Sequence, residues 1–293
     1  MVTMKLSIII VNYKTYDYTF SAIKSVLNSY IDFEYEIFLI DNASNDGSIE
    51  KLEQDFFDKI SNNKIEIIKN TENLGFAKAN NIAIKKSNSD YILLLNSDTK
   101  VSNTAIYGSV NYLESLHKPA ILTCKVLLED GKLDHACKRG FPTPEASFYY
   151  FTKLDKKNPQ KYGAYDYLTL DENEIGYVDA VSGAFMLIAK EIIENVGLLD
   201  EDYFMYAEDI DYCYRAKQAG YEIIYYPKET ITHYKNKSRQ KRKYKTIYNF
   251  YHTMWLFYKK HYIKKYNPLV TLSVICGILL KYLIELIKNA VRR

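Results

Sequence analysis

Cysteine is scarce in this chain of 293 residues, and its four cysteines are Cys124, Cys137, Cys213 and Cys276. They lack the close pairing of a zinc site and the density of a disulfide-stabilised domain. We therefore expect reduced thiols and a cytoplasmic compartment. A secretion signal is not expected, because Lys5 leads directly into the strand-like residues 6–11.

Long apolar runs are missing as well. The most apolar stretch, residues 269–280, has twelve residues without a charge, whereas a helix needs about 20 to cross a bilayer. We therefore expect a helix that begins at Pro268 and lies in the plane of a membrane surface, with Lys281 and Lys288 at its edge. A dimerisation helix that buries the same stripe, and hence a homodimer, is the alternative.

Acidic residues are nearly missing from the C-terminal part. Residues 235–293 contain 15 Lys and Arg but one acid, although the whole chain has a net charge of only +3. Seven of the eleven residues in Lys235–Lys245 are basic, and aromatic residues follow closely. Such a basic, aromatic, helical tail favours peripheral attachment to the anionic inner face of a cell membrane, with a solvated loop at 235–245 as the alternative. The acidic remainder argues against a nucleic-acid partner.

Strand and helix patterns alternate through the first part of the chain. Strands are predicted at residues 5–12, 36–40, 64–69 and 91–95, with helices to about residue 27, at 49–57 and at 75–86. This order is typical of right-handed βαβ units and predicts an α/β fold with a mostly parallel sheet flanked by helices. The hydrophobic content of 47% supports a globular domain over residues 1–234.

The later part of that domain is less regular. Residues 141–176 contain three prolines and little periodicity, which predicts an irregular insertion or loop. The pattern then predicts an apolar strand within 178–189 and a helix from Glu208 to about residue 219. A last strand is predicted at 221–226, ended by Pro227.

Acidic residues stand at the ends of three predicted elements. They are found in Asn96-Ser97-Asp98 after the strand at 91–95, at Asp41 after the strand at 36–40, and in Glu208-Asp209 at a helix start. Ligands of open α/β sheets bind beyond the carboxyl ends of strands, where a carboxylate can meet a phosphate through a divalent metal. An ionised carboxylate at a helix N-terminus is a competent general base. Turn and capping roles are the alternative, with Asp211 pairing Arg215.

Six short motifs follow one another along the chain. They are residues 7–13 (SIIIVNY), 40–48 (IDNASNDGS), 73–80 (NLGFAKAN), 94–98 (LLNSD), 182–184 (SGA) and 204–215 (FMYAEDIDYCYR). Together they resemble family 2 glycosyltransferases, and within that family the rhamnosyltransferase-like branch of bacterial polysaccharide synthesis. The resemblance covers about residues 5–235. It implies a GT-A fold, a Rossmann-like sheet that binds a nucleotide-diphosphate sugar across its strand ends.

The resemblance also implies a role for each matched residue. For binding of the donor it implies Val11, Tyr13, Asp41, Asn73, Gly75, Asn80, Asn96, Ser97 and Asp98, with Asp41 at a pyrimidine base. Asp209 would be the catalytic base, with Glu208 beside it. Ser182 and Gly183 would lie on the acceptor side, and Asp98 and His233 would bind the Mn²⁺ or Mg²⁺ that stabilises the diphosphate leaving group.

Two features depart from patterns of the family. Asn96 stands where an Asp is usual, which removes one negative charge from the metal site and predicts weaker metal binding. Trp255, the one tryptophan, lacks the Gln-any-any-Arg-Trp context of processive members, so we expect the addition of one sugar, or a few, per encounter.

The expected function is therefore inverting transfer of rhamnose or another hexose from a dTDP- or UDP-linked donor. The acceptor would be a hydroxyl of a lipid-linked glycan or oligosaccharide in cell-surface polysaccharide synthesis. A catalytically weak, donor-binding subunit of a polysaccharide assembly complex is the alternative, for which Asn96 leaves room. A nucleotidyltransferase is disfavoured because a Gly-rich basic loop is missing near Asn12–Thr15.

Overall fold

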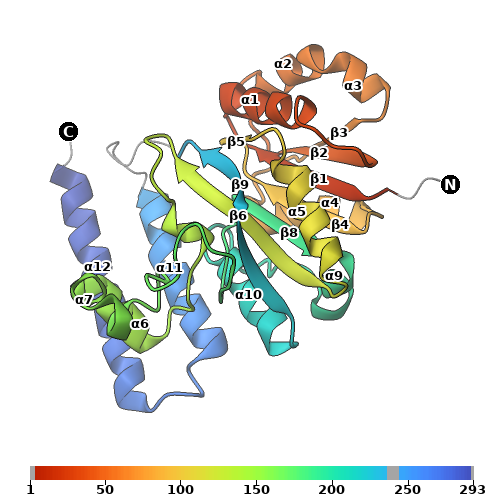
Figure 1. Cartoon of the computed structure of the whole chain (residues 1–293). Helices are drawn as coiled ribbons and strands as arrows, with labels where there is room; N and C mark the ends of the chain where they lie inside the picture. The colour runs from red at the N-terminus through yellow and green to blue at the C-terminus, as the bar shows by residue number, and fades with distance from the viewer. Residues whose placement is uncertain (1–3, 236–243, 292–293) are drawn as a thin grey trace.

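The computed structural model describes residues 4–235 and 244–291, which form one nine-stranded sheet with helices packed around it (Figure 1). Eight strands follow the order β3-β2-β1-β4-β8-β6-β9-β5, and β7 pairs with β9. The strands are β1 Leu6–Asn12, β2 Tyr35–Asp41, β3 Ile65–Lys69, β4 Tyr91–Leu95, β5 Thr99–Val101, β6 Ala120–Leu128, β7 Gly176–Tyr177, β8 Phe185–Ala189 and β9 Glu222–His233. The α/β fold predicted from the alternating pattern is confirmed.

The N-terminal half of the sheet is parallel. β1 pairs in parallel with β2 and β4, and β2 with β3, so that their carboxyl ends share one edge. The intervening helices are α1 Tyr16–Leu27, α2 Ser48–Asp55, α3 Phe57–Ser61 and α4 Gly75–Lys86, followed by α5 Ala105–Ser115. Residues 6–10 of β1 are fully buried, as expected for a central parallel strand covered on both faces.

The C-terminal half mixes strand directions. β8 is antiparallel to both β4 and β6, whereas β6 and β9 are parallel. The prediction that Pro227 ends the last strand is wrong, because β9 continues to His233. The register explains why: Cys124 pairs with Tyr226 and the next residue, Lys125, with Thr230, so the intervening residues bulge out. A proline without an N–H is tolerated at such a bulge.

Residues 141–176 contain helices where an irregular insertion was expected. They are α6 Pro144–Thr152, α7 Leu154–Lys157 and α8 Pro159–Tyr162. The side chain of Thr143 accepts from the backbone N–H of Ala146, and that of Asn158 from Lys161, so both residues cap a helix. Two of the three prolines that suggested a break, Pro144 and Pro159, occupy the first helical position, where a missing N–H costs nothing. The short helices η1 His135–Cys137, α9 Lys190–Val196 and α10 Glu208–Gln218 complete the domain.

Two long helices follow the sheet. α11 Tyr244–His261 buries Ile247 and Phe257, and the latter belongs to the same hydrophobic core as the strands. α12 Pro268–Val291 lies on the far side of α11 from the sheet (Figure 1). The predicted helix start at Pro268 is confirmed. Most of the basic cluster at 235–245 lies outside the described residues.

The length of α12 corrects the expectation of a segment too short to span a membrane. It has 24 residues, which corresponds to about 36 Å of helix. An 18-residue window reaches a mean hydropathy of 2.1, and none of that window is buried in the structure. By length and composition α12 could cross a bilayer. In-plane attachment and dimerisation both stay predictions.

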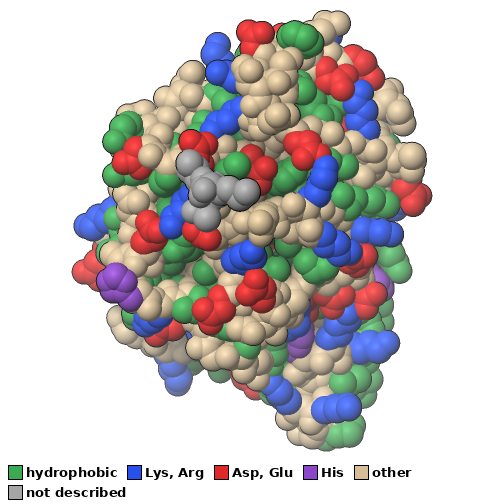
Figure 2. Space-filling view, turned by 90° about the vertical axis from the view of Figure 1, so that its right-hand side faces the viewer, with side chains coloured by type: hydrophobic (Ala, Val, Ile, Leu, Met, Phe, Trp, Pro, Cys, Tyr) green, Lys and Arg blue, Asp and Glu red, His purple; other side chains and the backbone are tan. Residues whose placement is uncertain are grey.

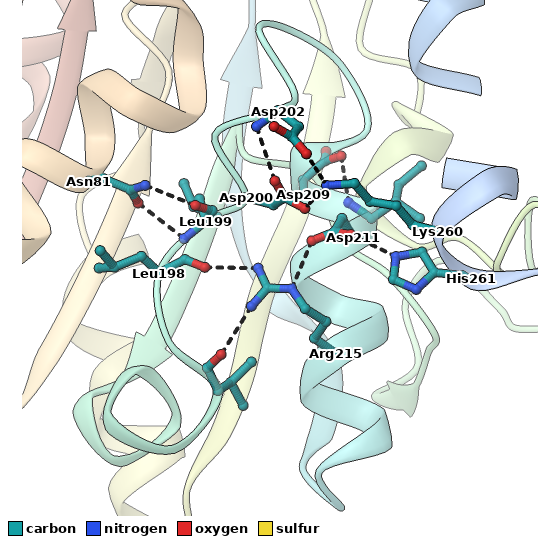
Figure 3. Close-up of polar contacts among 12 residues, drawn as sticks. Asn81, Leu198, Leu199, Asp200, Asp202, Asp209, Asp211, Arg215, Lys260 and His261 are labelled. Atoms are coloured by element: carbon teal, nitrogen blue, oxygen red, sulfur yellow. Dashed lines mark hydrogen bonds and ion pairs between the residues drawn. The ribbon is translucent and has the colours of Figure 1, made fainter. Parts of the chain in front are cut away.

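A buried carboxylate ties α10 to its neighbours (Figure 3). Asp211 is 0% exposed; Arg215 Nε donates to its Oδ2 at 2.8 Å, and His261 Nε2 lies 2.7 Å from its Oδ1. Arg215 also donates to the carbonyl oxygens of Val196 and Leu198. The predicted Asp211–Arg215 pair is thereby confirmed, within a network that joins α10, α11 and the loop after α9. Burial raises the pKa of Asp211, but the hydrogen bonds from His261 and Arg215 outweigh it and hold the pKa below its usual value.

We predict that Asp211→Asn lowers the free energy of unfolding by about 3–5 kcal/mol, because it breaks a buried, paired charge. The depressed pKa means that this contribution is present above the unfolded carboxyl's pKa of about 3.9 and is lost as the pH falls through the folded value. Chemical denaturation followed by circular dichroism at several pH values measures both effects. Asp130→Asn is the control, since Asp130 is exposed and pairs with Lys132 at the surface, and its cost should stay within about 0.5 kcal/mol. Equal losses in the two variants would contradict the assignment.

Candidate active site

A cavity of about 1390 Å³ opens beyond the carboxyl ends of β1, β2 and β4. It brings together most of the residues that the sequence motifs singled out. These are Val11, Tyr13, Asn73, Gly75, Asn96, Ser97, Asp98, Ser182, Gly183, Glu208, Asp209 and His233. Residues separated by more than 200 positions in the sequence therefore share one cavity.

Asp41 and Asn80 are not among the residues that line this cavity. Asp41 is 4% exposed, and its carboxylate accepts from Asn12 Nδ2 at 2.8 Å and from the hydroxyl of Ser44. Asn80 is 1% exposed and donates to the carbonyl oxygen of Phe76 at 2.8 Å. Both side chains shape the wall from behind, and direct contact with a ligand stays a prediction for each.

Asn42, which the motifs did not single out, lines the cavity next to Asp41. Its Nδ2 donates to Asn73 Oδ1 and to the carbonyl oxygen of Gly75, both at 3.1 Å. Its Oδ1 accepts from Asn70 Nδ2 and from the backbone N–H of Leu74. Asn42 therefore fixes the turn that leads into α4. The turn-rich sequence around it gave no means to tell this residue from its neighbours.

Gly75 connects this turn to the loop before α10. Its φ is +79°, and a Cβ at this position would overlap with the carbonyl oxygen of Phe204. The next residue, Phe76, donates its backbone N–H to the same oxygen at 2.8 Å. Because glycine alone permits so close an approach, Gly75 determines how near α4 comes to the loop that positions Glu208 and Asp209.

Asp98 and His233 meet at the edge where β4 ends and β9 pairs with β5. His233 Nε2 lies 3.0 Å from Asp98 Oδ1 and 3.4 Å from Asn96 Nδ2. On the other side of the ring, Nδ1 lies 3.3 Å from Asp134 Oδ2, and Lys235 Nζ donates to Asp134 Oδ1 at 2.7 Å. Burial lowers the pKa of His233, but the hydrogen bonds to Asp134 and Asp98 raise it more, so that the net shift is upward.

These side chains suit a hard divalent cation. A carboxylate oxygen and an imidazole nitrogen are acceptable ligands for Mn²⁺, and Asp134 at Nδ1 would be the outer carboxylate that orients the histidine if it bound a metal. Among the residues that the structure describes, no group of three His, Cys, Asp or Glu side chains is placed to hold a metal by itself. Asp98 and His233 would therefore need further oxygen ligands, such as those of a diphosphate.

Asp209, at the start of α10, is held by a cation that sequence reasoning missed. Arg139 Nη2 donates to Asp209 Oδ2 at 2.8 Å, and both side chains are 14% exposed. The backbone N–H of Gly183 donates to the same oxygen at 3.3 Å, and that of Ile210 to Oδ1 at 2.8 Å. A carboxylate accepts about four hydrogen bonds, so these donors leave room for about one more.

Glu208 differs from its neighbour in its surroundings. It is 7% exposed, and its Oε2 has no hydrogen-bond partner among the described residues. Burial, reinforced by the charge of Asp209, raises the pKa of Glu208 to about 8. Glu208 is therefore mostly protonated at neutral pH. Two adjacent carboxyl groups with such different surroundings are typical of a site that separates proton donor from proton acceptor.

A family model described as "Glycosyltransferase like family 2" matches residues 4–247. The low-salt glycan biosynthesis hexosyltransferase Agl10 of Haloferax volcanii is 30% identical over 228 residues, covering 74% of this chain and 63% of that protein. The rhamnosyltransferase WbbL of Escherichia coli is 29% identical over 168 residues, covering 55% of this chain and 61% of that protein. The chain thus matches less than two thirds of the length of these relatives.

Solved structures show the same fold. GalNAc-T7 with UDP, GalNAc and Mn²⁺ superposes with a TM-score of 0.60 at 18% identity, over 80% of this chain and 44% of that one. Residues 1–349 of TarS from S. aureus superpose with a TM-score of 0.55 at 16% identity, over 86% of this chain and 64% of that one. These neighbours are GT-A proteins, so the predicted GT-A fold is confirmed.

The role of Gly75 can be tested with a matched pair, Gly75→Ala and Gly47→Ala. Both glycines have a φ of +79°, so alanine should cost about 1–2 kcal/mol at either position. At Gly47 the added Cβ meets nothing within 4 Å, whereas at Gly75 it overlaps with Phe204. We expect Gly75→Ala to lower the melting temperature further and to speed amide hydrogen exchange over residues 204–211. Indistinguishable variants would contradict the close approach.

Proposed function

The chain belongs to glycosyltransferase family 2, and from that premise we propose that it transfers a hexose from a nucleotide-diphosphate sugar to a hydroxyl group of a glycan. The donor would be UDP- or dTDP-linked rhamnose or another hexose. The acceptor would be a lipid-linked or oligosaccharide chain in cell-surface polysaccharide synthesis. The observation that carries this proposal is the single cavity that holds both the Asp209–Arg139 pair and the Asp98–His233 pair.

The relatives support the same class of reaction. Agl10 is named a hexosyltransferase of glycan biosynthesis and WbbL a rhamnosyltransferase, so both names describe the transfer of a sugar. UDP is bound in structures of GalNAc-T7 and TarS. A pyrimidine diphosphate donor is therefore the natural first choice for this chain.

On the acceptor side, we propose that Asp209 is the general base. Oriented by Arg139 and Gly183, it would accept the proton of the acceptor hydroxyl through its remaining lone pair. The hydroxyl oxygen would form the new bond to the anomeric carbon while the bond from that carbon to the diphosphate oxygen breaks. Attack on the face opposite to the leaving group inverts the anomeric configuration. Glu208, whose pKa is raised by burial, is a weaker candidate for this role at neutral pH.

On the donor side, the turn fixed by Asn42 would hold the nucleoside. Val11 of β1 and Tyr13, directly after this strand, line the cavity, and Tyr13 is 41% exposed, so its ring is available for stacking on a base. Asn73 and Gly75 would line the ribose and sugar. Asp41 would position the pyrimidine base of the donor indirectly, by supporting the turn that holds the nucleoside. It would bind the base directly if the hydroxyl of Ser44 no longer donated its hydrogen bond to the Asp41 carboxylate.

Asp98 and His233 are the residues that would hold Mn²⁺ or Mg²⁺. When bound, the ion would stabilise the negative charge of the diphosphate leaving group. Asn96, which lies 3.4 Å from His233, is a neutral substitute for the usual acid, so we propose that metal affinity depends strongly on the donor's own oxygens.

We propose that α12 keeps the enzyme at the inner face of the cell membrane. Its large apolar side chains are exposed, with Leu272 at 57% and Leu283 at 55%. Burial of such a surface in lipid or against a second copy would be favourable. Either arrangement would hold the cavity next to an acceptor that is anchored in the membrane.

The proposed reaction is tested with a panel of UDP-, dTDP- and GDP-sugars and glycan acceptors in the presence of Mn²⁺, with nucleotide release and product configuration as readouts. Asp209→Asn should reduce transfer by about 10²–10⁴-fold while donor affinity is retained, because the base is lost and the donor side is intact. Asp130→Asn, at a surface turn, should transfer sugar like the wild type. Full activity of Asp209→Asn would refute the base assignment. Release of nucleotide from none of the donors by the wild type would favour a donor-binding subunit.

The outer carboxylate of His233 gives a second test. Asp134→Asn should weaken Mn²⁺ binding by about 10–100-fold, because the charge that orients the imidazole is lost. The asparagine side chain can still accept a hydrogen bond from the backbone N–H of Ala136, so the cap of η1 is preserved. Asp171→Asn is the matched control, since Asp171 likewise accepts a hydrogen bond from the backbone N–H two residues later, that of Asn173, but at an exposed turn. Titration calorimetry with Mn²⁺ and a UDP-sugar measures the affinity, and equal values for both variants would contradict the role of Asp134.

A further inference from the structure

Residues 138–140, which we name the strap, run between η1 and the insertion at 141–176. The N–H of Arg139 donates to the carbonyl oxygen of Ala180 at 2.9 Å, and the carbonyl oxygen of Arg139 accepts from the N–H of Ala180 at 2.8 Å, as in an antiparallel bridge. Successive side chains of an extended segment point to opposite sides. The strap therefore faces two neighbours, one at Arg139 and the other at the residues on either side of it.

On one side, the strap binds the last part of the insertion, residues 163–173, which we name the insertion loop. Lys138 Nζ donates to the carbonyl oxygens of Tyr167 and Leu170, both at 2.9 Å. The face shown in Figure 2 presents Lys and Arg side chains to water among Asp and Glu, whereas Lys138 is 2% exposed. Burial lowers the pKa of Lys138, and a buried ammonium group requires polar partners. The insertion loop supplies these partners.

Gly140 brings the backbone of the strap against the same loop. Its N–H donates to the carbonyl oxygen of Tyr165 at 2.7 Å. A Cβ at this position would lie 2.4 Å from the carbonyl oxygen of Ala164, so a larger residue would push the strap and the loop apart. The other end of the insertion loop is bound to the sheet, because Tyr225 of β9 donates its hydroxyl to the carbonyl oxygen of Glu172 at 2.7 Å. The strap thus rests on a loop that the sheet itself holds in place.

On the other side, Arg139 connects the strap to the candidate catalytic base. Its Nη2 donates to Asp209 Oδ2 at 2.8 Å and to the carbonyl oxygen of Val181 at 3.3 Å. The N–H of Gly183 donates to the same carboxylate oxygen at 3.3 Å. A guanidinium group is a planar, rigid fork, so the place of its backbone limits where Nη2 can meet the carboxylate. The position of the strap therefore affects the orientation of Asp209.

We propose that the insertion loop positions the general base: it fixes the strap through Lys138 and Gly140, and the strap holds Arg139 against Asp209. Lys138 and Gly140 are not among the residues that line the cavity, so they act as positioning residues through Arg139. This inference rests on the proposed function, because it takes Asp209 as the proton acceptor. A displacement of about 1 Å at a reacting group can cost about 10²-fold in rate. Loss of the loop contacts should therefore lower kcat and spare donor affinity.

Lys138→Met and Lys125→Met form a matched pair for the test. Both lysines bind the insertion loop, but Lys125 of β6 donates to two side chains at the other end of that loop, at 3.0 and 2.8 Å. Each substitution removes one ammonium group from the loop, and only Lys138→Met removes it from the strap. Gly140→Ala is a second variant of the strap, for use where Lys138→Met does not fold. Arg139→Lys retains the charge but lacks the planar fork.

The first readout is kcat with the donor and acceptor that the panel identifies. Lys138→Met should lower kcat by about 10–100-fold, because Asp209 is displaced, while the donor affinity measured by calorimetry stays that of the wild type. Lys125→Met should keep kcat close to the wild-type value. In an Arg139→Lys background, Lys138→Met should cost little more, because the strap then has no rigid fork to position. Contacts that only stabilise the fold would give additive losses instead.

The second readout needs no sugar. Because the N–H of Gly183 donates to Asp209 Oδ2, its hydrogen exchange, followed by NMR, reports whether the carboxylate stays in place. Lys138→Met should speed this exchange by about tenfold, the equivalent of one lost hydrogen bond. Lys125→Met should leave it unchanged. Thermal unfolding verifies that each variant is folded.

Three outcomes would overturn the inference. They are equal kcat values for Lys138→Met and Lys125→Met in an enzyme that transfers sugar, additive losses of Lys138→Met and Arg139→Lys, and exchange at Gly183 that does not respond to Lys138→Met. If the wild type releases nucleotide from none of the donors, the proposed function fails by itself. Exchange at Gly183 then still decides whether the strap orients Asp209.

Discussion

The candidate active-site cavity depends on one change of direction in the sheet, the antiparallel pairing of β4 with β8. Leu95 at the end of β4 faces Phe185 at the start of β8, and the N–H of Asn96 donates to the carbonyl oxygen of Ala184 at 3.2 Å. Residues that follow β4 therefore meet residues that precede β8. A parallel β8 would place Gly183 at the opposite edge of the sheet, away from Asp98.

Around this edge, charge pairing separates the roles of chemically similar groups. Asp209 is paired with Arg139, and Asp134 with Lys235 and His233. Burial raises the pKa of Asp134, but the contacts with His233 and Lys235 outweigh it and hold the pKa below its usual value. Glu208 forms no ion pair among the described residues, and burial raises its pKa. Position in the fold, more than residue type, thus decides which carboxyl group can act as a base.

Local patterns predicted the elements that local interactions build. α4 and β4 have the predicted limits of 75–86 and 91–95 because periodicity and turn residues mark both ends. Two predictions from prolines failed because the surrounding structure determines what a proline does. Pro227 was expected to end a strand but lies in a bulge of β9, and Pro144 was expected in an irregular insertion but starts a helix. Asp134 and Arg139 were missed because their partners lie 99 and 70 residues away, and no short motif encodes such contacts. The twelve-residue apolar run likewise suggested a segment too short to cross a membrane, whereas α12 has 24 residues.

The two sides of the cavity are therefore encoded differently. One side consists of strand ends and the turns that follow them, so short motifs such as Asn73–Asn80 are sufficient to recognise it. The other side is assembled from α6, α11 and α12, whose sequences share no motif and which meet only in the folded chain. Because these helices lie outside the sheet, their surface residues can change without disturbing the Asp98–His233 or Asp209–Arg139 pairs. A fold of this design can keep the charged pairs of the cavity while the helical wall beside them changes.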